Sequence, residues 1–201
     1  MLHPVRHVLN QKRIVLASGS PRRQELMKNL GINVEICPSR FEEDFKPEDF
    51  PSFCAYVEET ALHKVLEVSD RLHDPVPDVI IGADTVVTMD GVVYGKPKNK
   101  ERAFQILTKL MNRKHRVYTG VVIKIADKFI RFTETTDVYF GQATPEQIHA
   151  YVDTGEPLDK AGGYGIQGIG GTFIERIEGD YFTVIGLPLY RICRELYCLF
   201  R

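Results

Sequence analysis

Segments typical of strands alternate with segments typical of helices along this chain, and two stretches of it are typical of β-hairpins. One hairpin is expected over residues 86–94, turning at Asp90-Gly91. The other joins residues 117–125 to residues 129–140. A hairpin joins antiparallel strands, whereas parallel strands need a crossover connection. The sequence therefore predicts an α/β fold whose central, twisted sheet is mixed and flanked by helices.

Caps and helix breakers place the remaining elements. A short strand over residues 13–17 precedes a helix that Ser20-Pro21 opens and Gly31 closes. Further helices are expected from near Ser52 to about Val68, after Asn99, from Thr144-Pro145 to Gly155 and from Pro188, with strands over residues 78–83 and 181–185. We predict one domain over residues 13–201 and an N-terminal extension over residues 1–12.

Composition narrows the class of protein. The chain is 43% hydrophobic and 26% charged, so it can bury a core, and its formal charge is −1. The chain has no basic tail of the kind that binds polymeric nucleic acid. It also has no apolar run long enough to span a membrane or to act as a signal peptide. A cytoplasmic protein is expected. Its four cysteines form no C-x-x-C pair, which favours reduced, buried thiols over zinc or disulfides.

The segment from Ser18 to Arg23 combines a small-residue loop with the start of a helix. Backbone N–H groups at a helix start can bind an anion. Arg22 and Arg23 oppose the positive end of the helix dipole, so their charges are locally unfavourable without an anion. These residues favour a phosphate site over a capped surface helix with solvated arginines.

Two ionisable residues stand in apolar surroundings. Asp84 follows a buried strand, where it could either hold a metal or a water, or simply make a turn. Lys64 shares a helix face with apolar residues at helical spacing. It therefore extends either past its neighbours to solvent or into a polar cleft. The residues alone leave both choices open.

Three further segments are weaker. Lys96 follows a glycine like the end of a P-loop, but the required spacing is absent, which favours an exposed turn. The run Glu42-Glu43-Asp44 is expected to be a solvated loop, with a metal-binding carboxylate as the alternative. Residues 163–168 satisfy G-x-G-x-x-G, but no strand precedes them and no helix follows. We therefore reject a dinucleotide site and expect only a backbone that can approach a ligand closely.

Taken in order, seven segments resemble the Maf family of nucleotide pyrophosphatases. They are residues 16–23, 39–42, 61–64, 82–87, 95–97, 117–120 and 159–168. Each is weak alone, whereas seven in order over nearly the whole chain are highly specific. The resemblance implies two lobes around a deep cleft, a homodimer, and hydrolysis of nucleoside triphosphates to monophosphate and pyrophosphate. The resemblance includes a family member that is fused to a C-terminal methyltransferase-like domain. It therefore implies that this chain is fused to such a domain.

The resemblance also implies roles for single residues. The site would be lined by Ser18, Arg22, Arg23, Glu42, Lys64, Asp84, Lys96 and Lys160. Asp84 would accept a proton, and Glu42 with Asp84 would bind Mg²⁺ or Mn²⁺ as the cofactor. The cationic residues would neutralise the triphosphate and the leaving pyrophosphate.

Substrate choice within the family follows three positions that match Arg22, Thr85 and Gln167. This combination implies dTTP and UTP, with CTP and modified pyrimidine nucleotides as further candidates, in the clearing of the nucleotide pool. A primary amide can accept from the pyrimidine N3–H and donate to a carbonyl. Two alternatives remain, a nucleotide-sensing or division-inhibiting binding module and a structural partner domain. Asp84 argues against a sensor, which needs no proton acceptor.

Overall fold

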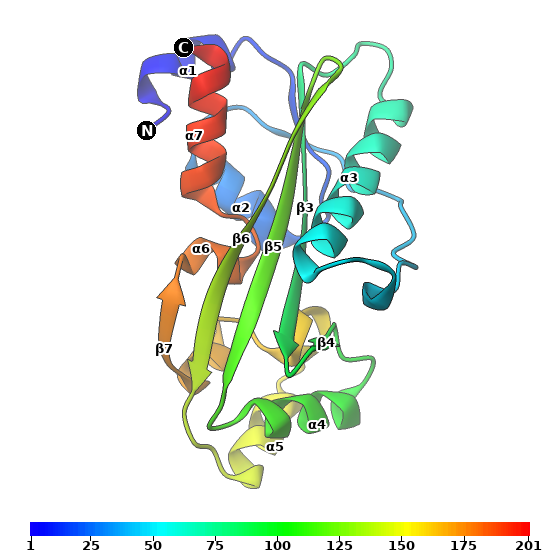
Figure 1. Ribbon diagram of the computed structural model, residues 1–201. Coiled ribbons are helices and arrows are strands. Elements are labelled where there is room, and N and C mark those ends of the chain that lie inside the picture. The colour runs from blue at the N-terminus through cyan, green and yellow to red at the C-terminus, as the bar shows by residue number, and fades with distance from the viewer. The chain divides into compact units, whose positions relative to one another are not determined.

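The computed structural model describes residues 1–201, which divide into two compact units. Unit 1 comprises Met1–Asp84, Thr119–Thr133 and Gly186–Arg201, and unit 2 comprises Thr85–Tyr118 and Glu134–Ile185. Three long strands, β3 (Val79–Met89), β5 (Lys114–Ile125) and β6 (Lys128–Phe140), contribute residues to both units (Figure 1). The cleft expected between two lobes stays a prediction.

The seven strands form one mixed sheet of order β2-β1-β3-β5-β6-β7, with β4 paired to β3. Strand β1 (Ile14–Leu16) runs parallel to both β2 (Glu35–Ile36) and β3. Strands β4 (Val92–Tyr94) and β7 (Ile174–Gly179) pair antiparallel with β3 and β6. The turn Asp90-Gly91 has φ of 53° and 75°, as a two-residue hairpin turn of type I′ requires. The predicted α/β fold with a mixed sheet is confirmed.

Unit 1 contains the three helices that the sequence predicts, α2 (Pro21–Asn29), α3 (Phe53–Arg71) and α7 (Leu189–Phe200). It also contains three short helices that the sequence did not predict, η1 (His3–Val5), α1 (Arg6–Leu9) and η2 (Pro47–Asp49). The Ser52 side chain accepts a hydrogen bond from the Ala55 backbone N at 3.1 Å and caps α3. Gly31, with φ of 69°, follows the end of α2.

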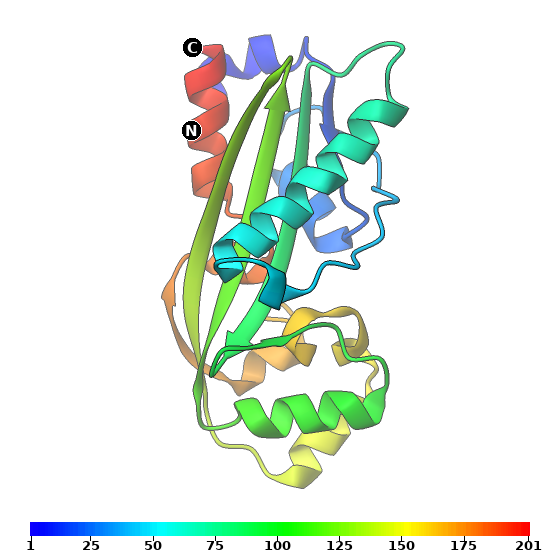
Figure 2. The ribbon, with the colours of Figure 1, turned by 45° about the vertical axis from the view of Figure 1, so that its right-hand side comes forward.

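Helix α3 packs closely on one face of the sheet in unit 1, while α2 and α7 lie on the other (Figure 2). Two glycines permit this approach. A Cβ on Gly82 of β3 would lie 2.5 Å from a methyl of Val65 and 2.8 Å from the backbone O of Ala61. A Cβ on Gly120 of β5 would lie 2.6 Å from the backbone of Val57. The sheet therefore has no side chain where the helix lies against it.

Unit 2 has its own core and its own caps. Its helices are α4 (Lys100–Leu110), η3 (Glu156–Asp159), α5 (Pro145–Asp153), η4 (Ala161–Gly163), η5 (Ile169–Phe173) and α6 (Tyr181–Ile185). Asn99 caps α4, and Thr144 forms a capping box with Gln147 at the start of α5. Helices α4 and α5 lie side by side (Figure 2) and bury Leu107, Ile148 and other apolar residues.

Strand β3 is longer than predicted. The sequence suggested a strand that ends before Asp84, but β3 continues through this residue to Met89. The residues that follow are rich in β-branched side chains, which favour extended structure. The Asp84 carboxylate binds a lysine on α3 instead of making a local turn. Asp84 therefore lies within a strand and not at its end.

The chain after the glycine-rich segment also differs from the prediction. Residues 181–185 were expected as a strand and instead form α6. Asp180 accepts hydrogen bonds from the backbone N of Thr183 at 2.6 Å and from its hydroxyl at 2.9 Å, which starts a helix. The strand that was missed is β7, whose sequence Ile-Glu-Arg-Ile-Glu-Gly is charged because it lies at the sheet edge.

The first twelve residues pack within unit 1, and the four cysteines form no disulfide. Residues 1–12 form η1 and α1 and bury Leu2, Val5 and Leu9 within unit 1. All four cysteines are free. Cys37 and Cys193 are buried as predicted, Cys54 is half-buried, and the expectation is wrong for Cys198, which is exposed. No helix combines the length and the apolar character that crossing a membrane requires.

Candidate active site

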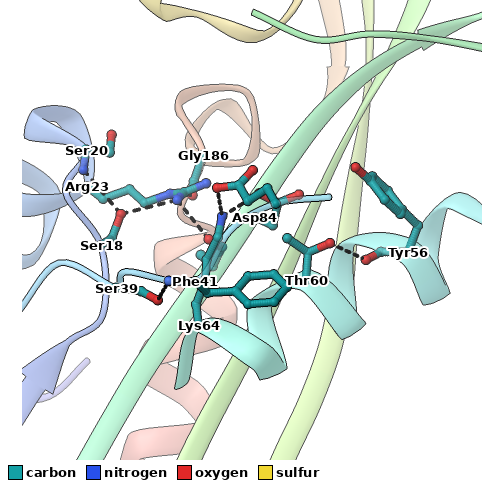
Figure 3. A network of polar contacts seen from close by, with 12 residues as sticks. Ser18, Ser20, Arg23, Ser39, Phe41, Tyr56, Thr60, Lys64, Asp84 and Gly186 are labelled. Atoms are coloured by element: carbon teal, nitrogen blue, oxygen red, sulfur yellow. Dashed lines mark hydrogen bonds and ion pairs between the residues drawn. The ribbon is translucent and has the colours of Figure 1, made fainter. Parts of the chain in front are cut away.

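A buried ion pair joins β3 to α3. Side chains alternate along a strand, so Asp84 faces the same side as Gly82, the side that α3 covers. Lys64 lies one turn after Ala61 on the buried face of α3. Its Nζ is 2.7 Å from Asp84 Oδ1, and the two side chains are 10% and 9% exposed (Figure 3). Lys64 therefore does not extend past its neighbours to solvent, and its place in a polar cleft stays a prediction.

A second carboxylate meets the same ammonium group, and it belongs to Glu43. Its Oε1 lies 2.8 Å from Lys64 Nζ, while half of its side chain is exposed. The neighbouring Glu42, which the resemblance implied, has an exposed side chain. The structure thus brings Glu43, and not Glu42, to Lys64 and Asp84.

Aromatic packing holds the loop around Glu43 against α3. Phe41 and Phe45 flank Glu43 in the loop before η2, and the Asp44 backbone N donates to the Glu42 carbonyl at 3.0 Å in a tight turn at Glu43. The Phe41 and Phe45 rings lie 5.1 Å and 5.0 Å from the ring of His63, the residue before Lys64. No pattern in the sequence distinguishes Glu43 from Glu42, because the contact with Lys64 depends on how this turn packs on α3.

The start of the same loop is held by polar contacts with α3. Ser39 Oγ accepts a hydrogen bond from the Phe41 backbone N at 3.0 Å. Glu67 accepts one from the Arg40 backbone N at 2.9 Å and is itself bound by Arg71. The pKa of Glu67 is lowered to about 2, chiefly by the hydrogen bond from Arg71. The loop that carries Glu43 is therefore attached to α3 both before and after this residue.

Arg23 supplies a fixed positive charge in the same unit. Its Nε donates to the Gly186 carbonyl at 2.7 Å, and its Nη1 donates to the Ala83 carbonyl at 2.8 Å and to Ser18 Oγ at 3.3 Å (Figure 3). Burial lowers the pKa of Arg23, and the negative charges of Asp84 and Glu43 oppose this effect. The guanidinium is thus held in place before any ligand arrives.

The Ser18–Gly19–Ser20 loop is folded around the Ser18 hydroxyl. Ser18 Oγ also accepts from the Ser20 backbone N at 3.3 Å, and Ser20 makes no side-chain cap on α2. Arg22, the next residue before Arg23, is half-buried. Phosphate binding by this loop stays a prediction.

Tyr56 is a neighbour of the site that the sequence did not reveal. Its ring packs edge-on against Phe50, with centroids 5.5 Å apart. Burial raises the pKa of Tyr56, and the charges of Asp84 and Glu43 raise it further. The phenol therefore keeps its proton and remains a hydrogen-bond donor close to two carboxylates.

The other predicted residues belong to unit 2. Lys96 is exposed in the turn after β4, Thr85 is half-buried, and Gln167 is exposed. Lys160 is largely buried, and its Nζ donates to the Glu156 carbonyl at 2.8 Å and to Asp159 Oδ1 at 2.6 Å. In this structure Lys160 therefore holds its own segment together.

The donor set of unit 1 fits a divalent metal that also binds phosphate. The carboxylates of Asp84 and Glu43 both form ion pairs with the Lys64 ammonium, so they lie close to each other. No group of three or more histidine, cysteine or carboxylate side chains could hold a metal by itself. Mg²⁺ is commonly bound by one or two carboxylates together with substrate phosphates. A carboxylate pair therefore suffices when the substrate supplies the remaining ligands.

The fold and these residues define a member of a known class. The chain belongs to the Maf family, because the family model described as Maf-like protein matches residues 13–199. It is 43% identical to the "Probable bifunctional dTTP/UTP pyrophosphatase/methyltransferase protein" of Homo sapiens, over 100% of this chain and 34% of that protein. The chain thus spans about a third of the human relative.

Two bacterial relatives match over nearly their full length. The dTTP/UTP pyrophosphatase of Bacillus cereus is 44% identical over 98% of this chain and 94% of its own length. The dTTP/UTP pyrophosphatase of Bacillus anthracis is 46% identical over 92% of this chain and 94% of its own length.

Proposed function

We propose that this protein hydrolyses dTTP and UTP to the monophosphate and pyrophosphate. The observation that carries the proposal is the buried Asp84 carboxylate, paired with Lys64 beside the fixed Arg23 guanidinium. Proteins 44% and 46% identical to this chain bear the name of this activity. The class of reaction is thus hydrolysis of the phosphoanhydride bond between the α and β phosphates.

Asp84 would act as the proton acceptor. A water attacks the α-phosphorus, a new P–O bond forms, the bond to the β-phosphate oxygen breaks, and the water proton passes to the carboxylate. The Lys64 ammonium holds Asp84 at 2.7 Å before substrate binds. A triphosphate competes for that ammonium, which would leave a carboxylate oxygen available to the water. Lys64 would then serve both the resting site and the bound phosphates.

Metal binding is part of the same proposal. Asp84 and Glu43 would hold Mg²⁺ or Mn²⁺ together with phosphate oxygens. When bound, such an ion polarises the α-phosphate and makes a coordinated water more acidic. Arg23, and by the family resemblance Ser18, Arg22, Lys96 and Lys160, would bind the anionic phosphates and the leaving pyrophosphate.

Base recognition would fall to Gln167 with Arg22 and Thr85. The Gln167 side chain is exposed, so its amide can meet a ligand. An amide matches the imide edge of uracil and thymine, which presents one N–H between two carbonyls. A site that hydrogen-bonds one edge rejects bases that leave its polar groups unpaired. We expect dTTP and UTP to be preferred to CTP, and CTP to purine nucleotides.

The assembly and location of the protein are inferred from the family alone. We infer a homodimer in the cytoplasm. A fusion to a methyltransferase-like domain is supported by the name of the human relative, of which this chain covers 34%. Light scattering of the purified protein measures the assembly, and a monomeric mass would contradict the dimer.

The decisive experiment measures pyrophosphate release from common nucleoside triphosphates with Mg²⁺ or Mn²⁺. We expect turnover of dTTP and UTP, abolished by a chelator and lowered at least about a hundredfold by Asp84→Asn, the scale of a lost general base. Stepwise release of single phosphates, or full activity in excess chelator, would contradict the mechanism. Nucleotide binding without turnover would instead favour a sensing module.

A further inference from the structure

The Glu156 carboxylate lies at the centre of the glycine-rich segment of unit 2. Its Oε2 accepts a hydrogen bond from the Ile169 backbone N at 2.9 Å. Its Oε1 accepts one from the Gly170 backbone N at 3.1 Å and one from the Tyr151 hydroxyl at 3.0 Å. Three donors from two elements therefore converge on one side chain, and two of them belong to the chain directly after Gln167.

The chain directly before Gln167 is anchored as well. Tyr164 is buried, and its hydroxyl lies 2.8 Å from Nε2 of the buried His115 on β5. Its ring packs edge-on against Phe140, with centroids 4.8 Å apart. The segment 164–170 is thus attached at both ends, and the exposed Gln167 lies between the two attachments.

The glycines of this segment make room for the anchoring residues. A Cβ on Gly168 would lie 2.6 Å from Glu156 Oε1, and one on Gly170 would lie 2.5 Å from the Tyr151 hydroxyl. A Cβ on Gly165 would lie 2.6 Å from the Lys160 side chain. The sequence suggested a backbone that approaches a ligand, whereas at these three positions the backbone approaches side chains of the protein itself.

The Tyr151 hydroxyl remains a hydrogen-bond donor to the Glu156 carboxylate. Burial raises the pKa of Tyr151, and so do the charge of Glu156 and the hydrogen bond to it. The phenol therefore stays protonated at neutral pH. Glu156 accepts charge-assisted hydrogen bonds, which are stronger than bonds between neutral groups.

We propose that Glu156 is a positioning residue for base selection, acting through the segment that carries Gln167. The proposal rests on the proposed function, because Gln167 is there the residue that meets the base. Glu156 itself touches the backbone on the far side of Gln167 and not the exposed amide. A change at Glu156 should therefore alter substrate discrimination and KM, and it should leave the proton transfer at Asp84 unaffected.

The test begins with Glu156→Gln, which keeps the size of the side chain but replaces one acceptor oxygen by an N–H donor. We expect kcat/KM for dTTP to fall about ten- to hundredfold, the cost of a small misplacement of a substrate-positioning group. The fall should lie mainly in KM, and the preference for dTTP over dGTP should shrink. Glu175→Gln, an exposed carboxylate on β7, is the matched control and should change neither value.

A double-mutant cycle with Gln167→Ala separates positioning from a general structural effect. If Glu156 acts through Gln167, Glu156→Gln should change the dTTP to dGTP preference little once Gln167 is alanine. Additive effects on the preference would overturn the proposal. Tyr151→Phe removes one donor only, and it tests the same point with a smaller loss if Glu156→Gln fails to fold.

Amide hydrogen exchange provides a readout that needs no activity. Glu156→Gln should speed exchange at Ile169 and Gly170, whereas Glu175→Gln should not. Unchanged exchange and an unchanged substrate preference in both Glu156→Gln and Tyr151→Phe would overturn the proposal. Absence of dTTP and UTP hydrolysis by the wild-type protein would contradict the proposed function instead, and the exchange experiment would still decide whether Glu156 holds the backbone of Ile169 and Gly170 in place.

Discussion

At the scale of single residues, the site depends on how a lysine is accommodated in an apolar helix face. Lys64 and Asp84 are both nearly buried, so each needs the other as a partner. Removing one partner of a buried pair leaves an uncompensated charge and costs about 3–5 kcal/mol. Substitution of Lys64 therefore changes stability and catalysis together, and it cannot separate the two. Glu43, whose side chain is half exposed, allows a cleaner test.

We predict that Glu43→Gln lowers activity while Glu42→Gln leaves it close to that of the wild type. Only Glu43 reaches the Lys64 ammonium, and the two side chains are adjacent in the chain and of equal size. The loss should be roughly tenfold or more in apparent Mg²⁺ or Mn²⁺ affinity, the usual cost of disturbing a metal's surroundings. Metal titrations of pyrophosphate release measure it. A loss confined to Glu42→Gln would restore the assignment made from the family resemblance.

At the scale of elements, the close contact of α3 with the sheet brings Lys64 to Asp84. The helix can lie this close because Gly82 and Gly120 have no side chains. Gly82 stands two residues before Asp84 on the same face of β3, so it controls the distance across which the ion pair forms. The packing of one glycine and the geometry of the site are thus connected through α3.

We predict that Gly82→Ala destabilises the protein by about 1–3 kcal/mol, the usual cost of overpacking a core. The new methyl would meet Val65 and the Ala61 carbonyl, and a backbone atom cannot yield as a flexible side chain can. Gly95→Ala is the control, because nothing lies within 4 Å of its Cβ and its φ is not positive. Chemical denaturation of both variants measures the difference. Equal stability of the two would contradict the account of the α3 contact.

Sequence patterns predicted those elements whose signals are local. Caps and hairpin turns, such as Asn99 and Asp90-Gly91, depend on a few adjacent residues, and the structure has them where expected. Strand β7 was missed because an edge strand needs few apolar residues. The residues that meet across long separations, such as Lys64 with Asp84 or Glu156 with Ile169, follow from tertiary packing and carry no local signal.

At the scale of the whole molecule, the two units share their strands. Unit 1 is built from three separate stretches of chain and unit 2 from two. Strands β3, β5 and β6 pass from one unit into the other without a break. Neither unit can therefore be produced by cutting the chain once. If β3, β5 or β6 unfolds in one unit, the other unit loses the continuation of the same strand.

We predict that the protein unfolds in a single cooperative transition. Domains that unfold separately are joined by linkers across which few contacts pass, whereas here each connection through β3, β5 and β6 is a hydrogen-bonded strand. Far-ultraviolet circular dichroism reports the helices of both units. Hydrogen exchange at Val65 of α3 and at Leu107 of α4 reports each unit by itself. Coincident midpoints in denaturant are expected. Two resolved transitions, with Val65 and Leu107 losing protection at different denaturant concentrations, would mean that the strands melt independently at their two ends.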